Sequence, residues 1–187
     1  MIRNKGGLAV TYTIRKGTAA DVPAVAAVYD ALLQYEEAHG TATGWQAGVY
    51  PTAAVAEGAA VQGTLFVLED GGAVGAAMIL NHVQAPEYAA AGWQYGALPE
   101  QVLVLHTLCI SPRVARRGYG RAMVQYAEDW AVRTGCAVVR LDTWMHNRPA
   151  RSLYEALGYR LAGSSPAKLN GLIPLELVFY EKAVGRT

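Results

Sequence analysis

The sequence predicts a single α/β domain in which helices flank a mixed β-sheet. Three observations lead to this fold class. The chain has 187 residues, which is close to the usual size of one domain. It is 52% hydrophobic and 17% charged, so it can bury a sizeable core. Its local patterns follow the order β-α-α-β-β-β-α-β-α-β-β without a repeat or a linker, and we therefore expect residues 1–187 to form one domain.

The N-terminal half is expected to contain two helices and three strands. Thr18 and Asp21 form a capping signal ahead of apolar residues at helical spacing, which predicts the start of the first helix. The sequence Asp70-Gly71-Gly72 is typical of a hairpin turn between two strands. In chain order, the patterns predict a strand (10–14), a helix (21–37), a loop (40–52), a second helix (53–61) and two strands (64–69 and 73–81).

The C-terminal half gives stronger signals. Residues 102–110 are apolar on both faces, which is typical of a central strand. Asn147 is a suitable N-cap for the helix that follows it, and Gly158 is a suitable residue to end that helix. In chain order, the patterns predict an irregular insert (86–99), a strand (102–110), a helix (118–134), a strand (138–143), a helix (149–157) and two strands (159–162 and 174–182).

Charge is distributed unevenly although the net charge is only +1. Residues 17–112 contain nine acidic residues and no Lys or Arg, whereas residues 113–187 contain 12 basic and 6 acidic residues. This asymmetry favours an anion site in the C-terminal part and attraction of a cation by the acidic part, with chance in an alanine-rich composition as the alternative. Basic residues are too few to indicate a nucleic-acid partner.

Composition also limits where the protein acts and what it binds. No apolar run approaches the ~18 residues that a membrane span needs, and the first residues contain no apolar signal core. Cys109 and Cys136 provide neither a disulfide framework nor metal-ligand spacing, so no metal is expected. His106 and Cys109 are three residues apart on a predicted strand, which would place their side chains on opposite faces and Cys109 in the core. We expect a cytoplasmic protein without a membrane partner.

The segment from Ser111 to Arg121 carries the strongest chemical signal. It lies between a predicted buried strand and a helix, and Gly118 and Gly120 would let main-chain N–H groups approach a ligand closely. A helix N-terminus favours negative charge. Four cations, suited to a phosphate or pyrophosphate, occur in the same segment: Arg113, Arg116, Arg117 and Arg121. A surface turn with scattered arginines is the other interpretation.

Two familiar phosphate motifs do not match this segment. The glycine- and lysine-containing string of a P-loop is absent. A dinucleotide fingerprint beginning at Gly118 and Gly120 would need a third glycine where Met123 stands, and the loop before it is too long. Asp142 lies 22 residues after Gly120, near the position of a ribose-binding acid, and is the one feature in favour of a dinucleotide.

Several strings together resemble a known family. They are Leu105-His-Thr-Leu-Cys-Ile-Ser-Pro, Arg117-Gly-Tyr-Gly-Arg-Ala-Met, Arg140-Leu-Asp-Thr and Asn147-Arg-Pro-Ala-Arg-Ser-Leu-Tyr-Glu-Ala-Leu-Gly-Tyr. With the order of elements over nearly the whole chain, they resemble the GNAT superfamily of N-acetyltransferases, which bind acetyl-CoA. The family's pyrophosphate loop prefers Gln or Arg at a position that is Ala115 here, and alanine cannot make the side-chain contact of that position.

The resemblance implies a mixed, mostly antiparallel central sheet and a particular cofactor site. The main chain of Leu108, Cys109 and Ile110 would pair with the pantetheine arm of acetyl-CoA and polarise the thioester carbonyl. Asn147 would reach the cofactor from the start of its helix, or serve only as an N-cap. The pyrophosphate would be held by Arg116, Arg117, Gly118, Tyr119, Gly120 and Arg121.

The resemblance also implies two catalytic residues. Tyr154 matches the family's usual general acid, which protonates the departing thiolate of CoA; a core tyrosine with a satisfied hydroxyl is the alternative. His106 matches a histidine of arylalkylamine acetyltransferases and would take the proton of the acceptor ammonium. A packed histidine is the alternative, with Glu36, Glu37 or a water chain then acting as the base.

Together these features predict an acetyl-CoA-dependent N-acetyltransferase that acts by direct transfer on a small amine or amino-acid-like acceptor. Alternatives are a different acyl donor, acetylation of a protein N-terminus or lysine, and a non-catalytic module that senses acyl-CoA. A homodimer is plausible for such folds. Four loop aromatics are candidates for lining the acceptor pocket: Trp45, Tyr50, Trp93 and Trp144.

Overall fold

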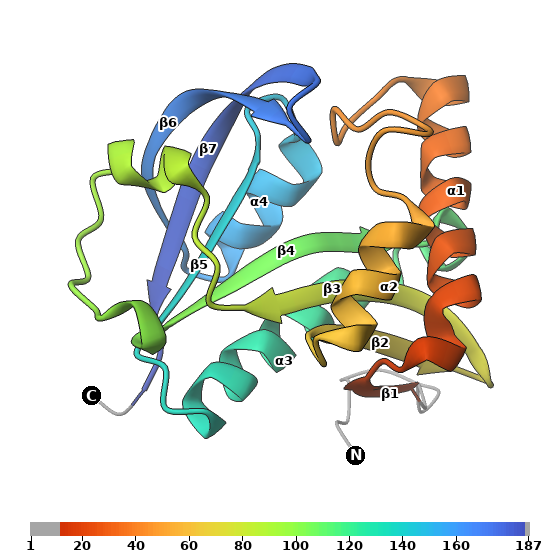
Figure 1. The fold of residues 1–187 in the computed structure, drawn as a ribbon, viewed down its shortest axis with the longest axis horizontal. Helices are drawn as coiled ribbons and strands as arrows, with labels where there is room; N and C mark the ends of the chain where they lie inside the picture. Colours follow the sequence, from red (N-terminus) through yellow and green to blue (C-terminus); the bar gives the residue numbers. More distant parts are fainter. Residues whose placement is uncertain (1–11, 186–187) are drawn as a thin grey trace.

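A computed structural model describes residues 12–185 and shows a seven-stranded sheet with helices on both faces (Figure 1). The strand order is β1-β2-β3-β4-β5-β7-β6, and β4 and β5 form the one parallel pair among the described strands. The strands are β1 (Tyr12–Lys16), β2 (Leu65–Asp70), β3 (Ala73–Asn81), β4 (Val102–Ile110), β5 (Val138–Trp144), β6 (Arg160–Leu169) and β7 (Ile173–Ala183). The helices are α1 (Val22–His39), α2 (Ala53–Val61), α3 (Tyr119–Arg133) and α4 (Arg148–Ala156). The mixed, mostly antiparallel sheet is therefore confirmed.

Most element boundaries agree closely with the sequence patterns, and the bounds of α2, β3 and β4 are the predicted ones. The first two residues of the predicted strand 10–14 lie outside the described residues. The exception is β6, predicted as 159–162 but extending to Leu169. Proline is unusual within a strand, and β6 contains Pro166. It is tolerated here because β6 is an edge strand of the sheet.

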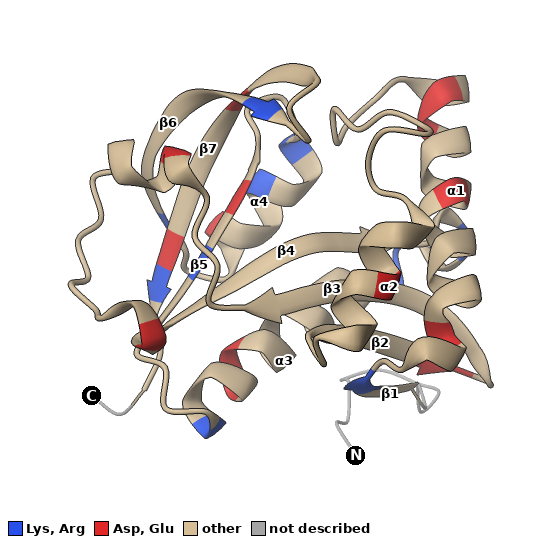
Figure 2. Ribbon diagram, viewed as in Figure 1, with Lys and Arg blue, Asp and Glu red and all other residues tan. Residues whose placement is uncertain are grey.

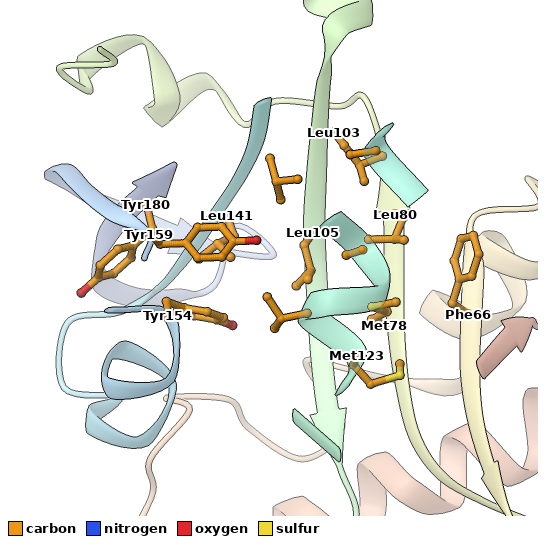
Figure 3. Close-up of a cluster of buried hydrophobic side chains, with 14 of the residues drawn as sticks. Phe66, Met78, Leu80, Leu103, Leu105, Met123, Leu141, Tyr154, Tyr159 and Tyr180 are labelled. Carbon is orange, nitrogen blue, oxygen red and sulfur yellow. The ribbon is translucent and has the colours of Figure 1, made fainter. Parts of the chain in front are cut away.

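Two main clusters of buried side chains pack on opposite faces of the sheet. On one face, Met78 and Leu105 of the sheet pack with Met123 of α3 and Tyr154 of α4 (Figure 3). On the other face, residues of α1 and α2 pack on Leu65, Val67, Ala77 and Ile79. The insert between β3 and β4 covers a further part of this second face through Tyr88, which contacts Phe179 edge-on.

A β-bulge interrupts β4 beside the centre of the sheet. Ile79 pairs with His106 and Ala77 pairs with Cys109, so two residues of β4 lie opposite the single residue Met78. One of the two is Thr107, whose φ is 51°, an unfavourable main-chain conformation for a β-branched residue.

The bulge overturns one expectation from the sequence. Directly paired residues share a face of the sheet, and the partners of His106 and Cys109 both belong to the cluster under α1 and α2. His106 and Cys109 therefore lie on the same face, and the prediction of opposite faces was wrong because the extra residue shifts the alternation. Cys109 is nevertheless a core residue: it is fully buried, and burial raises the pKa of its thiol.

Candidate active site

A gap opens in the sheet where β4 and β5 diverge. These strands pair only from Val102 and Val138 to Leu105 and Leu141, although both continue beyond this point. β5 remains paired with β7 as far as Trp144. The second half of β4 therefore has an unpaired edge toward β5, at the carboxyl ends of two parallel strands. Open α/β sheets bind ligands at such an edge.

Two cavities meet at this gap. We call the first, about 330 Å³, the α4 cavity; it extends from Gly120 at the start of α3 past Leu153 and Tyr154 of α4. We call the second, about 260 Å³, the hairpin cavity; it lies between the loop 40–52 and the β6–β7 hairpin. Residues that line both cavities are Thr43, Trp45, Leu105, Thr107, Asp142, Thr143 and Asn147. The two cavities are therefore adjacent at the gap, and we call the region of their shared lining the passage.

The main chain at the start of α3 offers several free donors. Gly118 adopts a φ of 80°, in the left-handed region that glycine tolerates, and α3 begins at the next residue. The first hydrogen bond of this helix runs from the N–H of Ala122 to the carbonyl of Gly118. The N–H groups of residues 118–121 precede that bond and can face an anion.

The arginines of this segment differ in their surroundings. Arg117 forms an ion pair with Asp70 at 3.0 Å, and the hydroxyl of the buried Tyr119 donates to the same carboxylate. Arg116 and Arg121 are exposed and have no ion pair within residues 12–185. Tyr119 can thus contribute its main chain to a ligand, while Arg116 and Arg121 retain free guanidinium groups.

The unpaired edge of β4 presents specific main-chain groups to the gap. The N–H of Ser111 donates to the carbonyl of Gly75 at 2.9 Å, so the main chain of Ser111 faces β3. The main-chain N–H and C=O groups of successive strand residues point to opposite edges of the strand. The main-chain groups of Cys109 therefore face β3 as well, while those of Leu108 and Ile110 face the gap. Leu108 and Ile110 line the α4 cavity, whereas Cys109 lines neither cavity. This geometry favours Leu108 and Ile110, and not Cys109, as main-chain partners of a ligand.

Tyr154 is buried within α4 at 4% exposure and lines the α4 cavity. Its hydroxyl is directed from α4 toward β4 (Figure 3). Burial raises the pKa of Tyr154, and the nearby charge of Asp142 raises it further. The phenol therefore keeps its proton at neutral pH, which is the state that a general acid needs.

His106 lines the hairpin cavity from β4. Its Nε2 lies 3.0 Å from Oδ1 of Asn81, which also accepts a hydrogen bond from the N–H of Val83. Oδ1 is thus an acceptor and His106 Nε2 the donor, which leaves the lone pair of a neutral imidazole on Nδ1. Burial lowers the pKa of His106, so the ring is neutral at pH 7.

The other candidate bases lie differently. Glu36 is buried beside the α4 cavity, but its carboxylate accepts hydrogen bonds from the side chains of Thr41 and Thr43 and from the N–H of Thr43. It therefore anchors the loop that follows α1. Glu37 is exposed and lines neither cavity.

Asn147 is an N-cap, as its sequence position suggests. Its Oδ1 accepts from the N–H of Ala150 at 3.2 Å, and its Nδ2 donates to Thr143 at 3.0 Å. Asn147 also lines both cavities, so it shapes the passage while holding the start of α4 in place.

Asp142 is the site residue that sequence reasoning considered only for a dinucleotide. It lies near the end of β5 and lines both cavities. The hydroxyl of Tyr88, from the insert between β3 and β4, donates to Oδ2 of Asp142 at 2.8 Å. Burial raises the pKa of Asp142 to about 6, against the opposing effect of this hydrogen bond. The one signal in the sequence is its position near the end of the predicted strand 138–143.

Three of the four loop aromatics line the hairpin cavity: Trp45, Tyr50 and Trp144. Trp93 does not; it packs against Tyr88, and the guanidinium of Arg140 lies 4.2 Å from the centre of its ring. The two walls of this cavity are joined by a hydrogen bond of 3.1 Å from Asn170 of the β6–β7 turn to the carbonyl of Val49.

Charged residues follow the division seen in the sequence. Acidic residues occur along α1, and α4 carries two arginines and one glutamate (Figure 2). Within residues 12–185, no group of three or more His, Cys, Asp or Glu residues is placed to hold a metal ion. In the same range, no helix combines the length and the apolar character of a membrane span.

Comparison with known proteins identifies relatives of this chain. Residues 26–159 match the acetyltransferase (GNAT) family. A segment of 60 residues is 37% identical to the uncharacterized N-acetyltransferase YhfO of Bacillus subtilis (strain 168), and it covers 32% of this chain and 40% of that relative. The matched segment thus spans about two fifths of the length of this curated relative.

Solved structures share the fold. An N-acetyltransferase from Staphylococcus aureus Mu50 superposes with a TM-score of 0.68 at 18% identity, over 94% of this chain and 99% of that one. A phosphinothricin acetyltransferase of the GNAT superfamily from Sinorhizobium meliloti, solved in complex with acetyl-CoA, gives a TM-score of 0.67 at 20% identity, over 94% of this chain and 89% of that one.

Proposed function

Since this chain belongs to the acetyltransferase (GNAT) family, we propose that it transfers the acetyl group of acetyl-CoA to the primary amine of a small or amino-acid-like acceptor. The observation that carries this proposal is the passage between β4 and β5. There a cavity that begins at the start of α3, with its free N–H groups, adjoins a second cavity lined by aromatic and acidic groups.

The α4 cavity suits the elongated, anionic acetyl-CoA. The free N–H groups of residues 118–121, with Arg116 and Arg121, would hold the pyrophosphate, while Arg117 contributes through its main chain and its ion pair with Asp70. The edge of β4 at Leu108 and Ile110 would pair with the amides of the pantetheine arm. Ala115 supplies no side-chain donor, so the main chain has to do more of the binding here.

The chain's own residues account for the two ends of the transfer. Main-chain N–H groups of β4 at the bulge would polarise the thioester carbonyl as negative charge develops on its oxygen. Tyr154 would then donate its proton to the sulfur as the carbon–sulfur bond breaks. The acceptor amine would attack from the hairpin cavity, where the neutral ring of His106 can hydrogen-bond to it.

The hairpin cavity supports a compact acceptor. Its volume of about 260 Å³ lies just below the range of about 300–1,000 Å³ that is usual for small-molecule sites, and the hydrogen bond between Asn170 and Val49 joins its two walls. Trp45, Tyr50 and Trp144 provide apolar surface for such a molecule.

Calorimetric titration of the protein with acetyl-CoA, with NAD as a control, tests the cofactor assignment. We expect saturable binding of acetyl-CoA and none of NAD. The substitution Tyr154→Phe should retain this affinity but lower kcat by about 10²–10⁴-fold, because only proton donation is lost. Absence of acetyl-CoA binding would refute the proposed function, and normal turnover of Tyr154→Phe would refute the general acid.

A further inference from the structure

We propose that the carboxylate of Asp142 binds the ammonium group of the acceptor and takes its proton, and that Tyr88 holds this carboxylate in place. This assignment rests on the proposed function, since it names the group that prepares the acceptor for attack. It makes Asp142 a catalytic residue and Tyr88, which acts through it, a positioning residue.

Position is the first argument. Asp142 is one of the residues that line both cavities, so its carboxyl group lies at the passage through which an acceptor must approach the thioester. Tyr154 lies close enough for the charge of Asp142 to affect its titration. The proposed proton acceptor and proton donor thus lie at the same passage. His106, by contrast, lines only the hairpin cavity.

The hydrogen bonds of the carboxyl group are the second argument. Oδ2 accepts from the hydroxyl of Tyr88, which orients the group. No side chain or main-chain N–H of residues 12–185 donates to Oδ1, which leaves this oxygen for a ligand. Tyr88 is itself fixed: it is buried at 3% exposure and packs edge-on against Phe179. A carboxylate with one oxygen anchored and one free is suited to a single ammonium ion.

The surrounding charges are the third argument. Titratable groups that contact Asp142 or affect its charge are Tyr88 and Glu87 of the insert, Tyr50 of the loop 40–52 and Tyr154 of α4. Those that share a cavity lining with it are Tyr35 and Glu36 of α1, His106 of β4 and Lys168 of β6. Arg140, two residues earlier on β5, acts on Tyr88 but is ion-paired with Glu181. Lys168 is exposed and has no ion pair with a described residue. No Lys, Arg or His of the described residues forms an ion pair with Asp142, and an acceptor ammonium would supply the neutralising charge.

The proton balance of the step is simple. The ammonium R–NH₃⁺ gives one proton to Asp142, which passes it to solvent. The nitrogen lone pair forms a bond to the thioester carbon, the carbon–sulfur bond breaks, and the sulfur takes a proton from Tyr154. The nitrogen releases its second proton, which restores the phenol. The products are the amide, the thiol and one proton in solution.

A carboxyl group with a pKa of about 6 is suited to this task, because it is ionised at neutral pH yet basic enough to accept a proton. The expected signature is an acidic limb in the pH dependence of kcat/KM, which reports the free enzyme.

The experiment compares two kinds of amine with wild-type protein and Asp142→Asn. Primary alkylamines, with benzylamine as the first probe, are cationic near pH 7 and must lose a proton. Aniline is already neutral at that pH. We expect Asp142→Asn to lower kcat/KM for the alkylamines by about 10²–10⁴-fold and to abolish the acidic limb, but to lower kcat/KM for aniline less than about tenfold. The matched control is Asp129→Asn, at an exposed acid of α3, which should change neither kcat/KM for the two amines nor the acidic limb.

Each other result is decisive. Equal losses for both amines would show a structural role and overturn the proposal, as would an alkylamine rate within about threefold of wild type. Loss of the limb in His106→Gln but not in Asp142→Asn would assign the base to His106 instead. Wild-type protein that binds acetyl-CoA but acetylates no primary alkylamine would overturn the role of Asp142, whereas failure to bind acetyl-CoA would refute the proposed function itself.

Discussion

The hydroxyl of Tyr50 is hydrogen-bonded to the side chain of Thr107, the residue of β4 that adopts a φ of 51°. Tyr50 comes from the loop after α1, so this contact ties a loop of the acceptor side to the bulge in the central strand. Both residues line the hairpin cavity, and Thr107 also lines the α4 cavity. The loop therefore helps to hold the main chain of β4 where it leaves its pairing with β5.

This contact predicts the effect of Tyr50→Phe. Loss of the hydroxyl leaves Thr107 without this partner, and we expect a decrease of about 1 kcal/mol in the free energy of unfolding. The value of kcat with benzylamine should fall, because the bulge is less well held, while the affinity for acetyl-CoA changes little. Urea unfolding, steady-state kinetics and calorimetry measure these quantities. Tyr126→Phe is the control, and an equal loss of stability in both variants would contradict the prediction.

The bulge also shows why part of the fold could be predicted and part could not. The strand 102–110 was predictable because its residues are apolar on both faces, whichever way its side chains alternate. The extra residue at Thr107 leaves no mark in that apolar run. It arises from pairing with β3, where two residues of β4 lie opposite Met78. The relative placement of His106 and Cys109 therefore could not be predicted from spacing alone.

The candidate site divides in the same way. The start of α3 was predictable because its glycines and arginines adjoin one another in sequence. Asp142 gains its importance from Tyr88, which is 54 residues away in the chain and reaches it from an irregular insert. No local pattern predicts such a contact. The parallel neighbourhood of β4 and β5, which places Asp142 at the gap, likewise depends on the sheet order.

The free guanidinium of Arg121 predicts a salt-dependent contribution to cofactor binding. We expect Arg121→Ala to weaken acetyl-CoA binding by about tenfold at low ionic strength, because a charged contact to the pyrophosphate is lost. The difference from wild type should shrink as salt is added, since exposed charges are screened. Calorimetry at two salt concentrations measures both effects. Arg133→Ala, at the other end of α3, is the control and should bind normally.

Asp21 predicts how stability depends on pH. Its carboxylate accepts hydrogen bonds from the guanidinium of Arg15 at 2.8 Å and from the N–H of Thr18 at 2.8 Å, so it connects β1 to the start of α1. The Arg15 hydrogen bonds are the main cause that lowers the pKa of Asp21. The charged carboxylate therefore stabilises the folded state at neutral pH, and this contribution is lost as the pH falls below the unfolded value of about 4.

We expect Asp21→Asn to lower the free energy of unfolding by about 1–2 kcal/mol near pH 7, a modest value because Arg15 is partly exposed. The difference from wild type should decrease as the pH is lowered below about 4, where wild type begins to lose the same interaction. Urea unfolding across this range measures the trend. Asp30→Asn, an exposed residue of α1, serves as the control. A difference that grows toward acid would show that the sign is wrong.

Tyr88 predicts a change in the pH profile that loss of packing alone would not cause. Its hydroxyl donates to Asp142 and favours the charged carboxylate, so the hydrogen bond lowers a pKa that burial raises to about 6. The variant Tyr88→Phe keeps the aromatic ring against Phe179 but removes this donor. The pKa of Asp142 should then rise, and the acidic limb of kcat/KM with benzylamine should move to higher pH. Activity would fall more near pH 6 than near pH 8, since in the alkaline range the carboxylate is ionised in both proteins.

The same profile measured for Tyr126→Phe controls for the loss of a phenol elsewhere. If the acidic limb of Tyr88→Phe stays at the pH of the wild-type limb, Tyr88 does not influence the pKa of Asp142 and the prediction is wrong.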